Sequence, residues 1–485
     1  MAGTILVEKL GIPGVFMVCN TFADDAKSAA VDNGMPTVRR REVSSAEFYK
    51  LRGDVKTVKP LVENILDDFV SALITPLTAE ESNPLEEKML DDGETAVTVT
   101  AESCRVALEE FNQKYLDNRW GDGLPLVPPT REAVDWMLSG TSRNPYEVLG
   151  TINPKHGIAT IEKIAINAVM AGAKPEYLPV VIAVIECLTD ETYDDLHVLA
   201  SAGSFNLLTV VSGPIAEEIG MEGGIGFMGH GWRPNNTIGR AIRLSTLNIG
   251  RTWPGINDMS LTGRVSAHTF YTICENAEFS PWAPYHASRG FKAEDSCVTV
   301  TPVHGESQLN HFYGGMIGTW TAEGVLDRMT QDLLRARRGL ITWGGKGVGK
   351  YPGSGGGAMN HMIILFPELV AEYKKTGYDQ KGLQDEIYRR VSVPFDELTQ
   401  QEVRAIRKGM ELSVVPDDRK PVFEAALKPG AMVPVLMSPE NLHLFVAGGA
   451  PGCAFSLNYL RVPPYNQTAI MTKRITGATL TKAGK

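Results

Sequence analysis

Hydrophobic residues recur along this chain in short segments whose spacing alternates between that of strands and that of helices. An apolar run at 15–19 predicts a strand, an alanine-rich segment at 22–32 predicts a helix, and 36–40 predicts a second strand. Residues 57–74 carry apolar side chains at helical spacing, which predicts an amphipathic helix. Together these elements predict that residues 1–76 form part of a doubly wound α/β domain.

The same alternation continues beyond an acidic segment rich in Pro, Thr and Glu at 77–100, which predicts a linker. We expect a central α+β domain at 101–339 and a C-terminal α/β domain with a Gly-rich loop at 340–485. The elements expected in these two domains are helices at 101–117, 132–138, 158–171, 178–188, 237–249, 322–338, 368–376 and 380–391, and strands at 207–212, 298–303, 340–343, 361–365 and 442–446. Thr130 is expected to cap the helix that follows it.

Composition narrows the class of protein. The 485 residues are 43% hydrophobic and 21% charged, which are ordinary globular values, and the net charge of −10 argues against a nucleic-acid-binding surface. No apolar run is long enough to span a bilayer, so no membrane partner is expected. The six cysteines are scattered without a Cys-x-x-Cys pair, which favours reduced thiols in a cytoplasmic protein and excludes a zinc ribbon.

Two glycine-rich segments are candidates for substrate binding. Residues 344–350 match the phosphate-binding pattern GxxxxGK, but a tyrosine and a proline replace the Ser/Thr and the helix that the pattern needs, which argues against nucleotide hydrolysis. One interpretation is a loop containing Gly345 that closes over a substrate, with Lys346 or Lys350 touching an anion. The alternative is a plain surface loop. Gly448 and Gly449 follow a predicted strand, where α/β sheets bind ligands, although such a pair also forms ordinary turns.

A second candidate segment runs from a glycine loop into the helix predicted at 237–249. His230, Arg233 and Asn235 precede the first turn, where free backbone N–H groups and an arginine would suit a carboxylate or phosphate. Arg240 lies on the same helix and is a further candidate for substrate binding. We expect the helix to be capped by residue 236 or 237. The alternative is a capped structural helix with exposed arginines.

The stretch 274–286 carries a thiol, two carboxylates and an imidazole on a backbone made irregular by two prolines. Glu275 and His286 could act as general base and acid, or could ligate one metal together with Glu278, although their spacing fits no named metal motif. Cys274 as a nucleophile is a weaker reading, because nothing fixes a lowered pKa. Loop packing with solvated charges is the structural alternative. His230 and Asp295 complete the set of candidate catalytic residues.

Several motifs together resemble the UGSC family of (seleno)proteins. The N-terminal ones are Glu8-Lys-Leu-Gly-Ile-Pro13, Asn20-Thr-Phe22 and Gly34-Met-Pro36. The later ones are Asp122-Gly-Leu-Pro-Leu-Val-Pro-Pro-Thr130, Glu162-Lys-Ile-Ala-Ile-Asn-Ala-Val-Met-Ala-Gly172, Thr237-Ile-Gly-Arg-Ala-Ile-Arg243, Ser280-Pro-Trp-Ala-Pro-Tyr-His286, Arg289-Gly-Phe291 and His443-Leu-Phe-Val-Ala-Gly-Gly449. The resemblance covers nearly the whole chain and implies a family, but no particular reaction.

One departure from the family stands out. The resemblance implies a selenocysteine/cysteine-Gly-Ser-Cys motif upstream of the first helix, and this chain has no such tetrapeptide. The opening helix, turn and strand at 3–19 also read as the middle of an α/β domain, since no strand precedes them. We expect a separate small Cys-Gly-Ser-Cys protein to supply the motif and the first strands; loss of the thiol chemistry is the alternative.

The expected function is an enzyme component of a thiol or selenol system that acts on a small anionic substrate by redox or carbon–heteroatom bond chemistry, as an oxidoreductase or lyase. The chain would be the large subunit of a hetero-oligomer. Two alternatives are a non-catalytic scaffold for the thiol-bearing partner, and a stand-alone lyase or hydrolase that uses Glu275 and His286. The sequence does not specify the substrate, a cofactor or a metal.

Overall fold

The computed structural model describes most of the chain. The described residues are 2–32, 34–48, 55–82, 96–193, 195–201, 205–260, 263, 269–303, 306–310, 321–335, 361–411, 415, 417–449, 456–461 and 470–479. They mix helices with strands in small sheets, which confirms a general α/β class. No helix in these ranges is long and apolar enough to cross a membrane.

The N-terminal unit is a small α/β arrangement at 2–82. Its elements are α1 (Ala2–Lys9), β1 (Val15–Cys19), the 3-10 helix η1 (Asn20–Phe22), α2 (Ala23–Asp32), β2 (Arg39–Val43), α3 (Ser45–Phe48), α4 (Val55–Ile74) and α5 (Ala79–Ser82). Strands β1 and β2 are parallel, with α2 in the connection between them. The core is small and centres on Ile5, Ala30 and Val38.

The middle of the chain is rich in helices that cover one mixed sheet. Its helices are α6 (Cys104–Asp117), α7 (Arg131–Leu138), α8 (Ile161–Met170), η2 (Pro175–Tyr177), α9 (Leu178–Leu188), α10 (Asp195–Ala200), α11 (Pro214–Glu218), α12 (Arg233–Asn248) and η3 (Tyr285–Arg289). Its strands are β3 (Val148–Ile152), β4 (Gly157–Thr160), β5 (Asn206–Ser212), β6 (Tyr271–Cys274) and β7 (Cys297–Val303). Thr130 caps α7 through a hydrogen bond from the Ala133 N–H, as the sequence predicts.

The last part of the chain forms a second sheet and its covering helices. The strands are β8 (Glu306–Asn310), β9 (His361–Leu365), β10 (Ser392–Pro394), β11 (Met432–Pro434), β12 (Leu442–Val446), β13 (Ser456–Arg461) and β14 (Met471–Arg474). The helices are α13 (Ala322–Arg335), α15 (Pro367–Lys375), α16 (Gln380–Arg390), η6 (Phe395–Glu397), α17 (Gln400–Glu411), α18 (Lys420–Ala426) and η7 (Pro439–Asn441).

Two four-stranded sheets organise this larger part of the molecule. The first has the strand order β14-β7-β5-β6 and the second has β12-β9-β13-β8. Each sheet contains one parallel pair, β5 with β6 and β9 with β12, while its other described pairs are antiparallel. Strand β8 precedes the predicted boundary at 339/340 but pairs in the second sheet, and β14 follows it but pairs in the first. The boundary itself stays a prediction.

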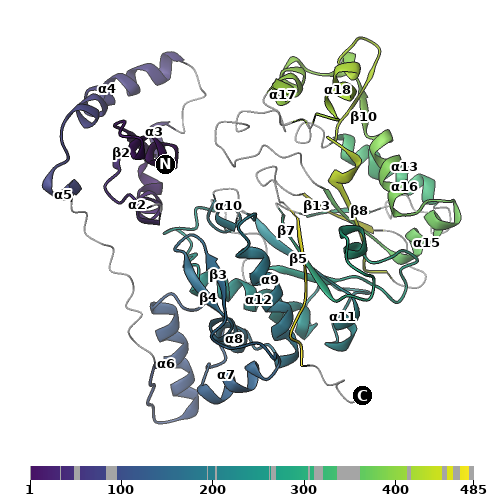
Figure 1. The fold of residues 1–485 in the computed structure, drawn as a ribbon, viewed down its shortest axis with the longest axis horizontal. Helices are drawn as coiled ribbons and strands as arrows, with labels where there is room; N and C mark the ends of the chain where they lie inside the picture. Colours follow the sequence, from purple (N-terminus) through teal and green to yellow (C-terminus); the bar gives the residue numbers. More distant parts are fainter. Residues whose placement is uncertain are drawn as a thin grey trace.

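The alternation of side chains along the strands shows that the two sheets pack face to face. Leu207 and Val211 of β5 join the core formed with α8, α9 and α12, whereas Leu208 and Val210 join a core with Met362 and other residues of the second sheet. The opposite face of the second sheet packs against α13, α15 and α16. Figure 1 shows these two groups of helices on either side of the paired sheets. The result is a four-layer α/β/β/α sandwich.

Several expected elements differ from the structure. The linker expected at 77–100 contains helix α5, and the strand expected at 340–343 lies outside the described residues. The strand predicted at 36–40 lies at Arg39–Val43, and the helix predicted at 158–171 is preceded by strand β4, so that Thr160 becomes its cap. Helix α12 begins at Arg233 rather than at 237, because the proline that follows Arg233 suits a first helical turn. The capping by 236 or 237 is therefore wrong, and both side chains bond back to carbonyls four residues earlier.

Candidate functional site

The carboxyl ends of strands from both sheets meet at one place. In the first sheet β5 and β6 end at Ser212 and Cys274, and in the second β12 ends at Val446. The N–H of Asn276 donates to the Val446 carbonyl at 2.8 Å, and its side-chain amide donates to the Gly448 carbonyl at 3.0 Å. Ligands of α/β sheets commonly bind outside the carboxyl ends of strands. This meeting point is therefore the candidate site.

Glu275 is buried at the centre of this site. The Ser212 hydroxyl donates to Oε2 at 2.5 Å, and the Tyr285 N–H donates to both carboxyl oxygens at 3.0 and 3.1 Å. Burial raises the pKa of Glu275 to about 7, although these hydrogen bonds act in the opposite direction. A carboxyl with such a pKa gives and takes a proton near neutral pH.

Tyr285 links this carboxyl to a histidine of the second sheet. The Tyr285 hydroxyl lies 2.9 Å from Nδ1 of His443, and the Tyr285 ring packs at 4.2 Å between centroids on the ring of Phe445. Burial lowers the pKa of His443 to about 3 and raises the pKa of Tyr285 to about 12. Both groups are therefore neutral at pH 7, and one hydrogen bond joins the hydroxyl to the imidazole.

The glycine-rich loop before α12 is held in place by Asn235. Its amide oxygen accepts from the Glu222 N–H at 3.0 Å, and its NH₂ donates to the carbonyls of Glu222 and Phe227 at 2.9 and 3.2 Å. The loop is also tied to the site, because the Gly223 carbonyl accepts from the Gly448 N–H at 2.6 Å. Asn235, expected to bind substrate, thus shapes one wall of the site.

Gly448 and Gly449 form a close approach on the other side. Both have positive φ values, of 80° and 101°, which favour glycine. A Cβ at Gly448 would lie 2.6 Å from the Phe366 ring, and one at Gly449 would lie 2.8 Å from the Glu368 carboxyl. Oε2 of Glu368 is buried and has no hydrogen-bond partner within the described ranges. A second acidic group therefore adjoins this glycine pair.

His286 follows Tyr285 in the chain but does not bond to Glu275 in the structure. Its Nε2 donates to the Lys292 carbonyl at 2.9 Å. Nδ1 is buried and has no hydrogen-bond partner among the residues described here. The expected Glu275–His286 pair is brought into neighbouring positions through Tyr285, not into direct contact.

Asp295 and His230 are not among the hydrogen-bond partners of the Glu275 carboxyl. Asp295 accepts from the Arg474 guanidinium at 2.6 Å and from the Lys292 N–H at 2.9 Å, and these partners lower its pKa. Its carboxylate thus holds the chain just before β7. His230 is exposed in the glycine-rich loop.

The two arginines expected to bind substrate have partners within the chain. Arg233 donates from Nε and Nη2 to the Gly172 carbonyl at 3.2 and 3.0 Å. Arg240 makes a bidentate pair with Asp122 at 2.8 and 2.9 Å and also donates to the carbonyls of Leu124 and Pro125. Arg240 thus fastens α12 to the proline-rich segment at 120–130, and Arg233 fastens its first turn to the residue pair that follows α8. Gly345 and Lys346 lie outside the described residues.

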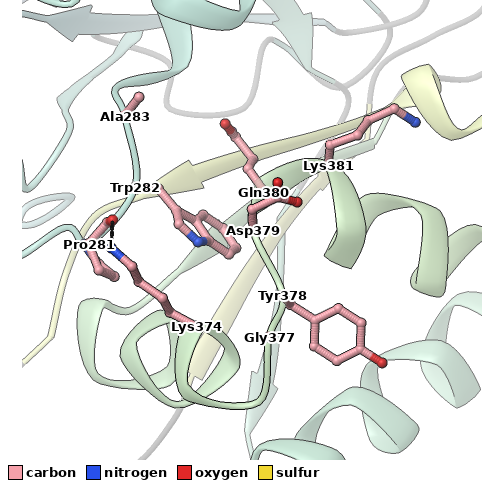
Figure 2. A pocket seen from close by; sticks show the side chains of 9 residues that line it. All are labelled: Pro281, Trp282, Ala283, Lys374, Gly377, Tyr378, Asp379, Gln380 and Lys381. Atoms are coloured by element: carbon pink, nitrogen blue, oxygen red, sulfur yellow. Dashed lines mark hydrogen bonds between the residues drawn. The ribbon is translucent and has the colours of Figure 1, made fainter.

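A shallow cavity of about 530 Å³ opens beside the segment that leads to Tyr285. Figure 2 shows Trp282 on one wall and the α15–α16 turn with Tyr378 and Gln380 on the other. Lys374 Nζ crosses to the Pro281 carbonyl at 2.9 Å, and Gln380 donates to a carbonyl of β12. One wall of this cavity thus precedes Tyr285 in the chain, and the other is hydrogen-bonded to Leu444, the residue after His443.

The buried thiols of the described ranges are poorly ionised. Burial raises the pKa of Cys274 to about 12 and that of Cys297 to about 11, and it raises the pKa of Cys187 as well. A buried thiol of high pKa is a weak nucleophile at neutral pH. In the same ranges no group of three His, Cys, Asp or Glu side chains could hold a metal ion.

Sequence reasoning selected Glu275, Gly448 and Gly449 of this site, and it missed the catalytic potential of Ser212 and His443. Ser212 ends a predicted strand just before Gly-Pro, and that position was a usable signal. His443 lies inside a predicted strand, where a histidine reads as a core residue. Comparisons with known protein families, with curated proteins and with solved structures find no match for this chain.

Proposed function

We propose that this chain is an enzyme, or the larger component of one, whose acid–base group is Glu275. The observation that carries this proposal is a buried carboxyl of pKa about 7 where strand ends of two sheets meet. Perturbed pKa values of this kind concentrate at active sites. The carboxyl would exchange a proton with a small polar substrate. The hydrogen bond from the Ser212 hydroxyl would change with the protonation state of the carboxyl.

The surrounding residues support the same role. Tyr285 holds the carboxyl through its N–H and is itself anchored by His443, so the carboxyl is positioned from both sheets. Asn276 and Gly448 fix the neighbouring backbone. Preorganised groups of this kind lower the cost of reorganisation during a proton transfer.

We further propose that redox or carbon–heteroatom bond chemistry needs a thiol or selenol from a partner, as the resemblance to UGSC proteins implies. The raised pKa values of Cys274 and Cys297 support an outside source of the thiol. The N-terminal unit has two parallel strands with α2 between them, which supports its interpretation as part of a doubly wound sheet. A small Cys-Gly-Ser-Cys protein would add the further strands.

The first experiment compares the wild-type protein with Glu275→Gln. Each is incubated with a small-molecule extract of the native host under reducing conditions, with and without proteins that co-purify from that host, and mass spectrometry follows which compounds are consumed. We expect Glu275→Gln to lower the turnover of a consumed compound by about 100-fold or more, the usual scale of general acid–base catalysis. The matched control is Glu278→Gln, which changes an exposed carboxyl three residues away.

Equal consumption by the wild type and Glu275→Gln would disprove the catalytic role. A stoichiometric Cys-Gly-Ser-Cys protein among the co-purifying chains is expected, and its absence from an active preparation would disprove the split thiol system. The non-catalytic scaffold is the second candidate, favoured by the internal partners of Arg233, Arg240 and Asp295. It predicts a stable complex whose activity is insensitive to Glu275→Gln.

A further inference from the structure

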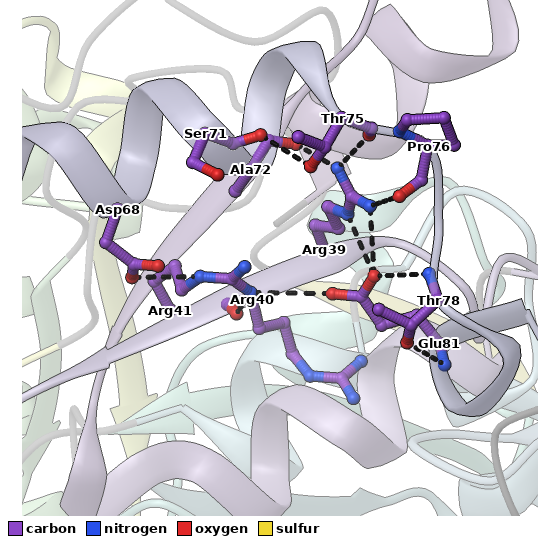
Figure 3. Close-up of polar contacts among 10 residues, drawn as sticks. All are labelled: Arg39, Arg40, Arg41, Asp68, Ser71, Ala72, Thr75, Pro76, Thr78 and Glu81. Atoms are coloured by element: carbon purple, nitrogen blue, oxygen red, sulfur yellow. Dashed lines mark hydrogen bonds and ion pairs between the residues drawn. The ribbon is translucent and has the colours of Figure 1, made fainter.

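Helix α4 of the N-terminal unit is anchored firmly at its C-terminal end. The Arg39 side chain from β2 donates to the carbonyls of Ala72, Thr75 and Pro76 and pairs with Glu81 at 2.9 Å (Figure 3). Arg39 is 7% exposed, so this cluster lies inside the unit. The last carbonyls of a helix are the acceptors that a cation satisfies best. These contacts therefore hold the C-terminal end of α4 against β2.

Along its length, however, α4 presents a second apolar stripe that the described residues do not cover. Leu61, Ile65 and Phe69 are half-buried toward the unit, and Ala72 is buried. At about 100° per residue, a different line along the helix carries apolar side chains that are largely exposed. These are Val55 (75% exposed), Val62 (41%), Leu66 (50%), Val70 (45%) and Leu73 (40%).

Charges beside this stripe have a polarity along the helix. Lys56 and Lys59 lie in its N-terminal half, while Glu63 and Asp67 lie further along on the same side. Lys59 reaches Glu63 at 3.6 Å, and both side chains are more than half exposed. In a parallel two-fold pair, the charged flanks of the two helices would lie at opposite edges of the interface and would not pair. In an antiparallel pair, the lysines of each helix adjoin the carboxylates of the other.

We propose that the exposed stripe of α4 is the interface with a second copy of this chain, in which two α4 helices pack antiparallel about a two-fold axis. Centring the axis near residue 64 sets Val55 against Leu73 and Val62 against Leu66, and it brings Lys59 within one turn of Asp67 of the second copy. A two-fold axis is the commonest symmetry of protein oligomers, and it makes every such contact twice. In this arrangement the partial positive N-terminus of each helix also lies near the partial negative C-terminus of the other, which is favourable.

The test is the oligomeric state of the full chain, measured by sedimentation velocity across a concentration series. A single helix pair is a small interface, so we expect a dimer that dissociates in the micromolar range. Leu66→Asp places one charge in the stripe of each copy, so that two charges meet in the interface. It is expected to weaken the dimer about 100-fold. The matched control is Leu108→Asp on α6, a helical leucine that is 42% exposed.

Charge reversal tests the antiparallel orientation. Lys59→Glu is expected to weaken the dimer about tenfold, and adding Asp67→Lys in the same chain restores it to within a few fold. Circular dichroism controls for helix content in each variant. A monomer at all concentrations, a dimer insensitive to Leu66→Asp, or a stripe covered only when a different protein is bound would overturn the proposal. Failure of Lys59→Glu/Asp67→Lys to recover would overturn the antiparallel arrangement.

Discussion

The N-terminal unit and the four-layer body use similar elements but bury them to very different extents. In the body both sheets are covered on both faces, and β5, β7, β9 and β12 consist entirely of buried residues. In the N-terminal unit, strand β1 has one buried residue, Val18, and the 20-residue helix α4 has one, Ala72. Hydrophobic sequence alone therefore does not determine burial, because a two-stranded sheet has too few neighbours to cover its apolar surface.

This difference separates two kinds of stability. The body has large apolar cores, whereas the N-terminal unit has a small one, is held by the polar contacts of Arg39 and exposes an apolar stripe of α4. The candidate site lies in the four-layer body. The surfaces that we propose for a partner and for a second copy lie in the unit.

The largest expected effect on stability comes from a substitution that would create a cavity between the two sheets. Phe445→Ala removes a fully buried ring that packs against Tyr285, and it is expected to lower the free energy of unfolding of the body by about 3–5 kcal/mol. Val38→Ala, in the small separate core of the N-terminal unit, should leave this transition unchanged. Chemical denaturation measures both. Equal shifts would mean that the two regions unfold together.

The next effect depends on pH and belongs to the body alone. Glu275 ionises near 4.5 in the unfolded chain and near 7 in the folded protein, so its contribution to stability is lost as pH rises between these values. The free energy of unfolding of Glu275→Gln, relative to that of the wild type, should therefore rise by about 3 kcal/mol between pH 4 and pH 8. A difference between the two proteins that does not change with pH would contradict the raised pKa.

His443 acts in the opposite direction and provides an internal check. Its pKa falls from an ordinary 6.5 to about 3 in the folded protein, so stability is lost as pH falls below 6.5. Because Glu275→Gln leaves this contribution in place, the variant should still lose stability on acidification. Denaturation curves recorded at several pH values separate the two groups.

The smallest effect concerns the N-terminal unit. Arg39→Met leaves helix carbonyls and Glu81 without their cation and is expected to cost about 2 kcal/mol of local stability. Hydrogen exchange should become faster in α4 while peptides of the body stay unchanged. The control is Arg41→Met, whose more exposed pair with Asp68 contributes less. Faster exchange in the body after Arg39→Met would instead show that the two regions form one folding unit.

Local pattern predicted most elements, because helix caps and apolar periodicity act over a few residues. Thr130 capped the expected helix, and the strand predicted at 361–365 is β9. The start of α12 was an error of local pattern, since the proline after Arg233 suits a first helical turn, but another error arose where neighbours in space decided the outcome. Residues 157–160 form a strand because they pair with β3, and sequence periodicity carries no record of that pairing.

The sequence by itself determined the general α/β class, the irregular segment around Glu275, and the glycines after β12. Only the tertiary structure decided that Glu275, Ser212 and His443 would share one buried cluster, since they come from three strands of two sheets. It also decided that Arg233 and Arg240 would bind their own chain. The sequence does not distinguish an arginine that is exposed to solvent from one that is paired within the chain. Burial, which shifts the pKa of Glu275, arises only when distant strands pack together.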